Sequence, residues 1–387
     1  MHIFLNALGA NTASGLTYLR NVLPQLAARV DVKTTVAVHP RLSGEFRNQA
    51  GVSLADVPRL NGSGRRFWFE QRRLPILLRD LRVDVLISAG NFAIRKSSVP
   101  QILLSGNSLY ISRDFHNDLL ARGEYALWVD TRVKAIFAKK SIHWADRTVA
   151  PTQAFADELR RWTGKPVNAI HHGFDRGIFF GDQTPLPTAM QSQLDSAKDA
   201  LKLLYVSHYN YFRNFETLFR AVPLIREKVK GKAVRLFLTC KLEPGENPGS
   251  YKTEPALLLI KKLGIENEIA ELGAVPYRQL HHLYRSCDIY VAPSYAETFA
   301  HPLVEAMACR LPVVASDLAV HREVCGASVR YFSSFSPEEL ADQVLRAAVS
   351  ESDRQCSAQV PFSWRAHVDQ LLDLAKGLVP GRVAAAA

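Results

Sequence analysis

The sequence of 387 residues predicts an α/β protein of two domains, each built around its own parallel sheet. Short apolar runs of strand length alternate with amphipathic stretches of helical spacing, which is typical of βαβ units. This alternation stops in a segment rich in Pro, Gln and Ser at residues 181–199 and then starts again, so we expect a linker there. A chain of this length is also large for a single core.

The first half shows the alternation in order along the chain, beginning with a strand at the N-terminus. The last of its helices is expected to begin after Thr152, which is a good N-cap residue. The expected strands are Ile3–Leu8, Val32–His39, Val83–Ser88, Gln101–Ser105, Thr148–Pro151 and Val167–His171. The expected helices are Leu16–Val30, Leu74–Leu81, Val133–Trp144 and Ala154–Trp162.

The second half repeats the pattern. The expected strands are Leu201–Val206, Val234–Cys240, Ile269–Leu272, Ile289–Ala292, Leu311–Ala315 and Val329–Tyr331. The expected helices are Asn214–Lys228, Ala256–Leu263, Tyr277–Arg285, Leu303–Ala308 and Pro337–Ala348. We therefore predict two facing Rossmann-like domains with a cleft between them, at residues 1–180 and 200–362. The closing segment 363–387 has helical spacing, and we expect it to cross back onto the first domain.

The net charge of +11 is confined to the first half of the chain. Residues 1–180 hold 25 Lys and Arg against 14 Asp and Glu, whereas residues 181–387 hold 23 of each. A basic domain suits an acidic partner, such as anionic lipid, a lipid-linked diphosphate or nucleic acid, although a basic balance also serves solubility alone. The five scattered cysteines and the absence of a recognisable signal peptide predict a cytoplasmic protein with reduced thiols.

The segment Ser294–Asp317 is the most informative part of the sequence. Its acids Glu297 and Glu305 lie eight positions apart, across a loop that is predicted to turn into a helix. A helix that begins after a tight loop offers backbone N–H groups and the positive end of its dipole, which suit a phosphate. Two carboxylates beside such a site suit sugar hydroxyls. The combination points to a nucleotide sugar.

This segment closely resembles the donor site of family 4 glycosyltransferases, a large retaining group with the GT-B fold. The spacing of the two glutamates is weak by itself, but the surrounding residues strengthen the resemblance, which is clear from about residue 145 to residue 375. Four further segments resemble parts of the family pattern, namely the strand and phosphate loop of the second domain, the inter-domain segment, and two shorter stretches: Leu204–Leu218, His171–Asp175, Ala145–Thr152 and Phe362–Trp364.

The resemblance implies a role for each matching residue of this segment. Glu305 would bind the ribose hydroxyls of the donor, and Glu297 would approach the transferred sugar. The backbone N–H groups of three residues, together with the neighbouring helix start, would hold the donor: Thr298, Phe299, Ala300 and Leu303. The family usually has glycine where this chain has Thr298, Ala300 and Arg310, and we expect these replacements to narrow the sugar pocket.

Two further cations of the family pattern fall on Arg213 and His208, in the loop after the first strand of the second domain. They would neutralise the leaving diphosphate, because fixed cations stabilise the charge that develops there. Arg213 keeps its charge at any working pH, whereas a histidine with an ordinary pKa near 6.5 carries it only in part. A packing or capping role for His208 stays open.

The first domain offers three weaker candidates. The loop Gly9–Gly15 follows the first strand, and the resemblance implies that Gly15 lets the backbone approach the donor phosphates, although a plain turn is an equal interpretation. Asn107 stands near the place where many family members have a histidine, and we expect it to hydrogen-bond the sugar or the acceptor. His116 lies further along as a minor candidate.

The basic stretch Arg65–Arg82 mixes arginines with aromatic side chains. This composition suits a surface that contacts anionic lipid, and Arg132, Lys134, Lys139 and Lys140 could extend it. An ordinary amphipathic helix with solvated arginines is the alternative, and the sequence does not decide between them.

The sequence therefore predicts a retaining glycosyltransferase that moves a sugar, with mannose as a candidate, from a nucleoside diphosphate to a lipid-linked or polysaccharide acceptor. We expect no metal or other cofactor, because no Asp-x-Asp pair or zinc spacing is present. We expect no nucleic acid, because no binding module is recognisable, and a location on the cytoplasmic face of a membrane. The alternatives are a sugar-nucleotide epimerase of the same architecture and a degenerate transferase that only binds.

Overall fold

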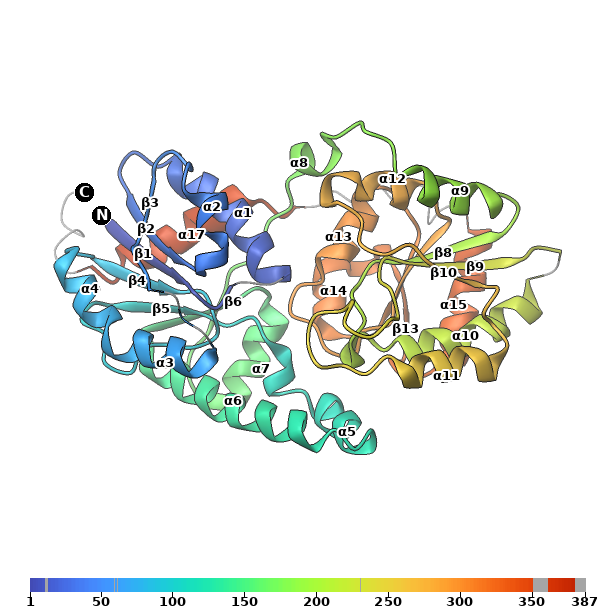
Figure 1. The fold of residues 1–387 in the computed structure, drawn as a ribbon, viewed down its shortest axis with the longest axis horizontal. Helices are drawn as coiled ribbons and strands as arrows, with labels where there is room; N and C mark the ends of the chain where they lie inside the picture. Colours follow the sequence, from blue (N-terminus) through green and yellow to red (C-terminus); the bar gives the residue numbers. More distant parts are fainter. Residues whose placement is uncertain (11–12, 59, 61, 230, 351–360, 380–387) are drawn as a thin grey trace. The chain divides into compact units, whose positions relative to one another are not determined.

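The computed structural model describes residues 1–10, 13–58, 60, 62–229, 231–350 and 361–379 (Figure 1). The chain divides into two compact units. Unit 1 combines Met1–Ile111, Trp128–Gly173 and the segment from Phe362 onward, and unit 2 combines Ser112–Leu127 with Phe174–Pro361. Each unit is an α/β domain with one sheet.

The sheet of unit 1 is parallel throughout, with the strand order β3-β2-β1-β4-β5-β6-β7. Its strands are β1 (His2–Ala7), β2 (Lys33–Val38), β3 (Val52–Leu54), β4 (Val85–Ser88), β5 (Gln101–Leu104), β6 (Arg147–Ala150) and β7 (Asn168–Ala169). The order reverses between β1 and β4, so unit 1 has its topological switch point at the carboxyl ends of these two strands. All six strands expected for residues 1–180 are present, and β3 is an additional edge strand.

Helices cover both faces of this sheet. They are α1 (Ala13–Ala27), α2 (Ser43–Phe46), α3 (Ser63–Arg72), α4 (Leu74–Asp80), α6 (Tyr125–Trp144, which enters unit 1 at Trp128), α7 (Gln153–Thr163) and α17 (Trp364–Lys376), with short 3-10 turns η1 (Pro40–Leu42) and η2 (Ser108–Tyr110). Successive residues of β1 point to opposite faces, so Ile3 and Leu5 join one buried cluster, whereas Phe4 joins another. Both faces of the sheet are therefore buried, as parallel sheets require.

The closing helix α17 packs on α1 in unit 1, as expected from its helical spacing. Trp364, Val368 and Leu371 share the buried cluster of β1, and the hydroxyl of Tyr18 lies 3.0 Å from Nε2 of His367. Residues almost 350 positions apart in the sequence thus form one core. The C-terminal segment completes the first domain.

The sheet of unit 2 has the strand order β10-β9-β8-β11-β12-β13 and is also parallel. Its strands are β8 (Leu201–Tyr205), β9 (Val234–Leu238), β10 (Ile269–Glu271), β11 (Ile289–Ala292), β12 (Val313–Ser316) and β13 (Arg330–Phe332). The order reverses between β8 and β11, which places the switch point of unit 2 at their carboxyl ends.

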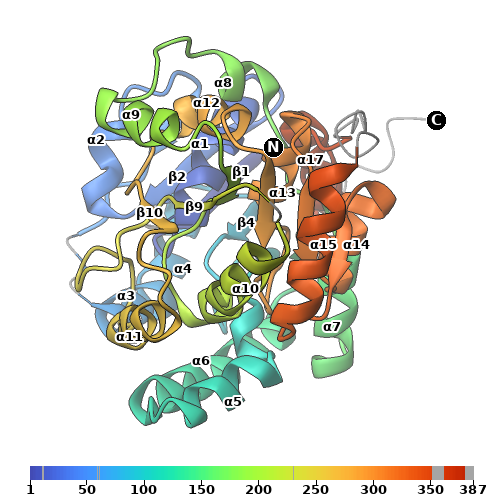
Figure 2. The same ribbon diagram turned by 90° about the vertical axis from the view of Figure 1, so that its right-hand side faces the viewer.

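The helices of unit 2 include α10, α11 and α15, which pack together beside the sheet (Figure 2). Among the described residues, the helices of this unit are α5 (Arg113–Ala121), α8 (Arg176–Phe180), α9 (Thr188–Ser196), α10 (Phe215–Lys228), α11 (Glu254–Leu263), α12 (Leu280–Arg285), α13 (His301–Ala308), α14 (Ala319–Cys325) and α15 (Pro337–Val349), with 3-10 turns η3 (Tyr211–Arg213), η4 (Tyr277–Gln279) and η5 (Gly326–Ser328).

The division into units differs from the predicted boundaries at three places. The first domain was predicted to end at residue 180, but unit 2 takes up the chain at Phe174 and therefore includes α8. The segment expected to be a linker, residues 181–199, contains α9, and Leu194 of that helix is buried in unit 2. In addition, α5 belongs to unit 2 although it lies within the first half of the sequence. Its Asp118 accepts a 2.8 Å hydrogen bond from the hydroxyl of Tyr295, and the neighbouring Arg122 forms a 2.9 Å ion pair with Glu216.

Four of the five cysteines are free thiols in the structure, and Cys356 lies outside the described residues. Within the described part of the chain, no helix has the length and apolar character that crossing a membrane requires.

Candidate functional site

The loop between β11 and α13 is the centre of the candidate site. It leaves the sheet of unit 2 at the carboxyl end of β11, beside the switch point with β8. Ligands of open α/β sheets bind outside the carboxyl ends of the strands at such a point. Both predicted glutamates belong to this region, since Glu297 lies in the loop and Glu305 lies in α13.

Glu305 is a buried carboxylate that is 5% exposed. It accepts a 2.9 Å hydrogen bond from the hydroxyl of Tyr284 on α12. Burial raises the pKa of Glu305 to about 7, and the hydrogen bond from Tyr284 offsets part of this shift. Burying the charged form of this carboxylate costs free energy, and ligand hydroxyls that donate hydrogen bonds to it would stabilise that form.

Glu297 lies directly against Arg213, although the two residues are 84 positions apart in the sequence. A guanidinium nitrogen of Arg213 donates to Oε1 of Glu297, and the same nitrogen is 3.4 Å from the hydroxyl of Ser294. The turn η3 that carries Arg213 is held in place by Tyr205, whose hydroxyl donates a 2.8 Å hydrogen bond to the carbonyl of Arg213. One cation and one carboxylate are therefore paired at the switch point.

His208 lies in the same loop with an exposed side chain. Local desolvation lowers its pKa, and the charge of Arg213 lowers it further. A histidine whose pKa lies below its usual 6.5 is neutral near pH 7. The structure therefore assigns the positive charge of this loop to Arg213, and His208 offers a neutral imidazole.

Two of the positions where the family usually has glycine keep the backbone geometry of glycine. Ala300 has φ +64° and Arg310 has φ +58°, both in the left-handed region that other residues seldom adopt. Thr298 is not among the residues with positive φ. Ala300 is the residue at which α13 begins, and its carbonyl accepts a 3.0 Å hydrogen bond from the N–H of Leu303. Residues other than glycine thus adopt a left-handed backbone at both ends of α13.

Phe299 and Leu303 are buried on either side of this helix start. The ring of Phe299 lies 4.8 Å from that of His301, centroid to centroid. The side chains of Phe299 and Leu303 are both apolar, so they can shape and anchor the loop. Any polar contact that these two residues make with a ligand must come from their backbone.

The candidates from the first half belong to unit 1, apart from His116, which is buried on α5 in unit 2. Gly15 lies in the first turn of α1, where an added Cβ would come within 2.7 Å of the Cα of Ala10. Gly15 therefore has a packing role, whatever else it does. Asn107 accepts a 3.0 Å hydrogen bond from the N–H of Leu109 and caps η2. Asn11 and Thr12 of the predicted glycine loop lie outside the described residues.

The structure adds residues that the sequence analysis missed. Tyr284 gave no sequence signal, because its contact with Glu305 depends on the packing of α12 against α13. Asn214 was detectable only as a neighbour of Arg213; it has φ +56°, and its amide donates a 3.0 Å hydrogen bond to the carbonyl of Pro293. It thereby ties the loop after β8 to the loop after β11.

Unit 1 contains a second polar group that the sequence analysis missed, at the end of β1. Asn6 donates a 3.1 Å hydrogen bond to the buried Glu70, and Nε of Arg66 lies 3.8 Å from the same carboxylate. A Cβ added to Gly9 would lie 3.3 Å from Arg66, so this arginine reaches over the loop that follows β1. A cation therefore lies beside the switch point of unit 1.

No group of three or more His, Cys, Asp and Glu side chains among the described residues is arranged to hold a metal ion.

Two parallel sheets, each with a topological switch point, define an open α/β protein of the doubly wound type. Family models match both halves of the chain: Glycosyltransferase Family 4 over residues 16–177 and Glycosyl transferases group 1 over residues 188–359. The chain therefore belongs to the family 4 type of glycosyltransferases with the GT-B fold.

Curated relatives match part of the chain. D-inositol 3-phosphate glycosyltransferase 1 of Catenulispora acidiphila is 29% identical over 255 residues, which cover 61% of this chain and 58% of the relative. The D-inositol 3-phosphate glycosyltransferase of Saccharomonospora viridis is 29% identical over 276 residues, which cover 67% and 61%. The chain thus spans about three fifths of the length of these relatives.

Solved structures share the fold over nearly the whole chain. Sucrose-phosphate synthase from Thermosynechococcus elongatus superposes with a TM-score of 0.70 at 16% identity, covering 98% of this chain and 99% of that one. Anabaena HepE in complex with UDP-glucose also gives a TM-score of 0.70 at 16% identity, covering 98% and 100%. WaaG, a glycosyltransferase involved in lipopolysaccharide biosynthesis, gives a TM-score of 0.65 at 15% identity, covering 98% of this chain and 100% of that one.

Proposed function

We propose that this protein is a retaining glycosyltransferase that moves a sugar from a nucleoside diphosphate to a hydroxyl of a lipid-linked or polysaccharide acceptor. The observation that carries the proposal is the pairing of Arg213 with Glu297 at the switch point of unit 2, in the segment that also holds the buried carboxylate of Glu305. The complexes of Anabaena HepE with UDP and UDP-glucose support a nucleotide-sugar donor for a chain of this fold.

The buried carboxylate is suited to the ribose of the donor. In its ionised form Glu305 accepts hydrogen bonds only, so it pairs with two adjacent hydroxyl donors. Tyr284 occupies one acceptor position and orients the carboxylate. We propose that ribose hydroxyls bind the carboxylate beside Tyr284, replacing with hydrogen bonds the solvation that burial removes.

Arg213 and Glu297 are suited to the diphosphate and the sugar, respectively. In the free protein they neutralise each other. A bound diphosphate would attract the guanidinium of Arg213, which leaves the Glu297 carboxylate able to accept hydrogen bonds from sugar hydroxyls. The backbone N–H groups of Thr298, Phe299 and Ala300 would hold the diphosphate at the start of α13.

The chemical step that we propose is substitution on one face of the sugar. The bond from the anomeric carbon to the diphosphate oxygen breaks, and the acceptor oxygen bonds to that carbon from the same side. The leaving diphosphate takes the acceptor proton, so no side-chain base is required and no metal ion is needed. Arg213 stabilises the negative charge that develops on the leaving group, while the neutral His208 donates or accepts only a hydrogen bond.

The acceptor side of the proposal depends on unit 1. Arg66 beside Gly9 provides a cation at the switch point of this unit, which suits an acceptor that carries phosphate or carboxylate. The relatives named D-inositol 3-phosphate glycosyltransferases are named for a phosphorylated acceptor, and WaaG is named for lipopolysaccharide biosynthesis. We propose an anionic acceptor, mannose as one candidate sugar, and work at the cytoplasmic face of a membrane.

A panel of nucleotide sugars tested by thermal shift checks whether the protein binds such a donor at the proposed site. One nucleoside diphosphate sugar should raise the melting temperature, because a ligand that binds only the folded state stabilises it. The variant Glu305→Ala should lose this shift while keeping the unliganded transition. An unchanged affinity in Glu305→Ala would disprove the site assignment. Incubation of the protein with donor alone separates a transferase from an epimerase, since only an epimerase converts the donor without an acceptor.

A further inference from the structure

The outer side of α6 is apolar where a surface helix is usually polar. The side chains that α6 buries are mostly small: Thr131, Ala135, Ala138, Ser141 and Ile142. Its large apolar residues point outward instead, since Val129, Val133 and Ile136 are 52%, 46% and 56% exposed. This reverses the normal amphipathic pattern, in which the apolar stripe faces the core. An exposed apolar stripe of this kind marks a surface that another body covers.

The stripe continues onto α3, which lies beside α6 in unit 1 (Figure 1). The rings of Phe67 on α3 and Phe137 on α6 are in contact, with centroids 5.6 Å apart. Trp68 follows Phe67 and is 60% exposed. We call the following six residues the apolar face: Val129, Val133, Ile136, Phe137, Phe67 and Trp68.

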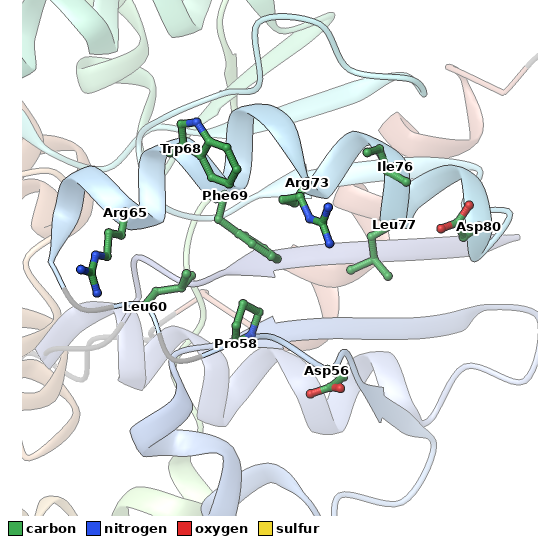
Figure 3. Close-up of a pocket in the computed structure, with 10 residues that line it drawn as sticks. All are labelled: Asp56, Pro58, Leu60, Arg65, Trp68, Phe69, Arg73, Ile76, Leu77 and Asp80. Carbon is green, nitrogen blue, oxygen red and sulfur yellow. The ribbon is translucent and has the colours of Figure 1, made fainter.

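A hollow lined in part by Trp68 lies along α3 and α4 (Figure 3). It has a volume of about 520 Å³, and apolar side chains form most of its walls: Pro58, Leu60, Trp68, Phe69, Ile76 and Leu77. Arg65 and Arg73 also line it, as do Asp56 and Asp80. The hollow offers room for hydrocarbon beside the exposed tryptophan.

The charges around the apolar face have one dominant sign. Exposed cations belong to the same two helices or directly follow α3: Arg65, Arg72, Arg73, Arg132, Lys134, Lys139 and Lys140. Of the acids on the same two helices, Asp130 forms a 2.6 Å ion pair with Lys134 and so offsets one of these cations, and Glu70 is buried against Asn6. The two acids of the hollow, Asp56 and Asp80, reduce the positive excess but do not remove it. The surface therefore combines apolar side chains with an excess of positive charge.

We propose that the apolar face docks unit 1 on the surface of an anionic lipid bilayer. Apolar and aromatic side chains would enter the boundary between head groups and acyl chains, and the surrounding cations would meet lipid phosphates. A second copy of the chain fits less well, because a two-fold interface would bring the same cations together. The biological role of this docking rests on the proposed function, since a lipid-linked acceptor is reached at a bilayer. The docking itself can be measured without any transfer reaction.

The test is co-sedimentation of the full chain with vesicles of phosphatidylcholine alone and of phosphatidylcholine mixed with phosphatidylglycerol. The chain should bind the anionic vesicles preferentially and lose binding as salt is raised. The variant Val133→Ser/Ile136→Ser should reduce partitioning about tenfold or more, since it removes apolar area from the contact. Leu258→Ser is the matched control, because Leu258 is a 68% exposed apolar residue on the basic helix α11 of unit 2.

Two readouts keep the outcomes separate. The melting temperature of Val133→Ser/Ile136→Ser should match that of the parent, because both side chains are already exposed. Its thermal shift with the nucleotide sugar should also be unchanged. Equal partitioning of parent and variant, or binding that ignores phosphatidylglycerol, overturns the docking surface. The docking surface is also overturned if the parent binds no vesicles but forms a dimer by light scattering, and Val133→Ser/Ile136→Ser abolishes that dimer. Vesicle binding without any nucleotide-sugar shift would instead count against the transferase.

Discussion

At the residue scale, the candidate site contains a carboxyl group that is close to changing its charge near neutral pH. Glu305 differs from an ordinary surface glutamate because it is buried and receives one neutral hydrogen bond from Tyr284. Glu297, the other glutamate of this segment, instead has its negative charge neutralised by Arg213. Two glutamates of one short segment thus have opposite environments, and their roles follow from that difference.

The first prediction concerns Glu305→Gln. The pKa of Glu305 in the folded protein, about 7, lies above its ordinary value of 4.5, so the folded state binds this proton more tightly. Stability contributed by the group is therefore present below about pH 4.5 and is lost as the pH rises through 7. Removing the charge should stabilise the fold at pH 8 by roughly 3 kcal/mol at most, with a smaller gain at pH 5.5.

Thermal melts of the parent and of Glu305→Gln at both pH values check this prediction. A gain that is the same at both values would contradict it. The nucleotide affinity of the parent should also fall as the pH drops below about 7, because a protonated carboxyl loses acceptor capacity. Glu305→Gln should bind nucleotide weakly at every pH.

At the element scale, the start of α13 keeps a glycine-like backbone without glycine. The predicted strands and helices of this region were correct because the periodicity of their apolar residues is strong. The φ of +64° at Ala300 was not predicted, since the backbone course of a loop depends on the elements that it joins. An alanine in this conformation costs about 1 kcal/mol relative to glycine.

The second prediction is that Ala300→Gly raises the free energy of unfolding by about 1 kcal/mol, because it relieves this conformation. Ala306→Gly, in the interior of the same helix, is the control and should lower it by about 1 kcal/mol or more. Urea denaturation of the two variants measures both effects. Destabilisation by Ala300→Gly would show that the Cβ of Ala300 makes a packing contact worth more than the strain.

The helices α6 and α5 show where periodicity misleads. The prediction began the α6 helix at Val133, although it extends back to Tyr125, because its outward apolar residues hide the helical pattern. The sequence position of α5 suggested the first domain. The ion pair between Arg122 and Glu216, together with the hydrogen bond between Asp118 and Tyr295, assigns it to unit 2. Neither contact can be read from local sequence.

At the scale of the whole molecule, unit 1 is completed by residues from the end of the chain. Gly173 ends the second segment of unit 1, and the segment from Phe362 returns to it. A Cβ added to Gly173 would lie 2.0 Å from the backbone nitrogen of Trp364, so the beginning of α17 rests on this glycine. The packing of α17 within unit 1 therefore explains why the segment His171–Asp175 carries glycine at position 173.

The third prediction is that Gly173→Ala destabilises unit 1 by about 2 kcal/mol or more, because the overlap is with backbone that cannot rotate away. Gly44→Ala is the matched control, since a Cβ at Gly44 would have no neighbour within 4 Å, and it should be neutral or slightly stabilising. Hydrogen exchange should show faster exchange in α17 and α1 of Gly173→Ala. Equal protection of α17 in both variants would contradict the prediction.

The sequence by itself determined the α/β class, the two parallel sheets and the segment that holds Glu297 and Glu305. These properties depend on local periodicity and on residue types at short spacing, which a sequence displays directly. The tertiary structure decided the pairing of Arg213 with Glu297, the contact of Tyr284 with Glu305, the unit to which α5 belongs and the exposure of the apolar residues of α6. Each of these depends on contacts between distant parts of the chain, and burial, charge pairing and pKa are properties of those contacts.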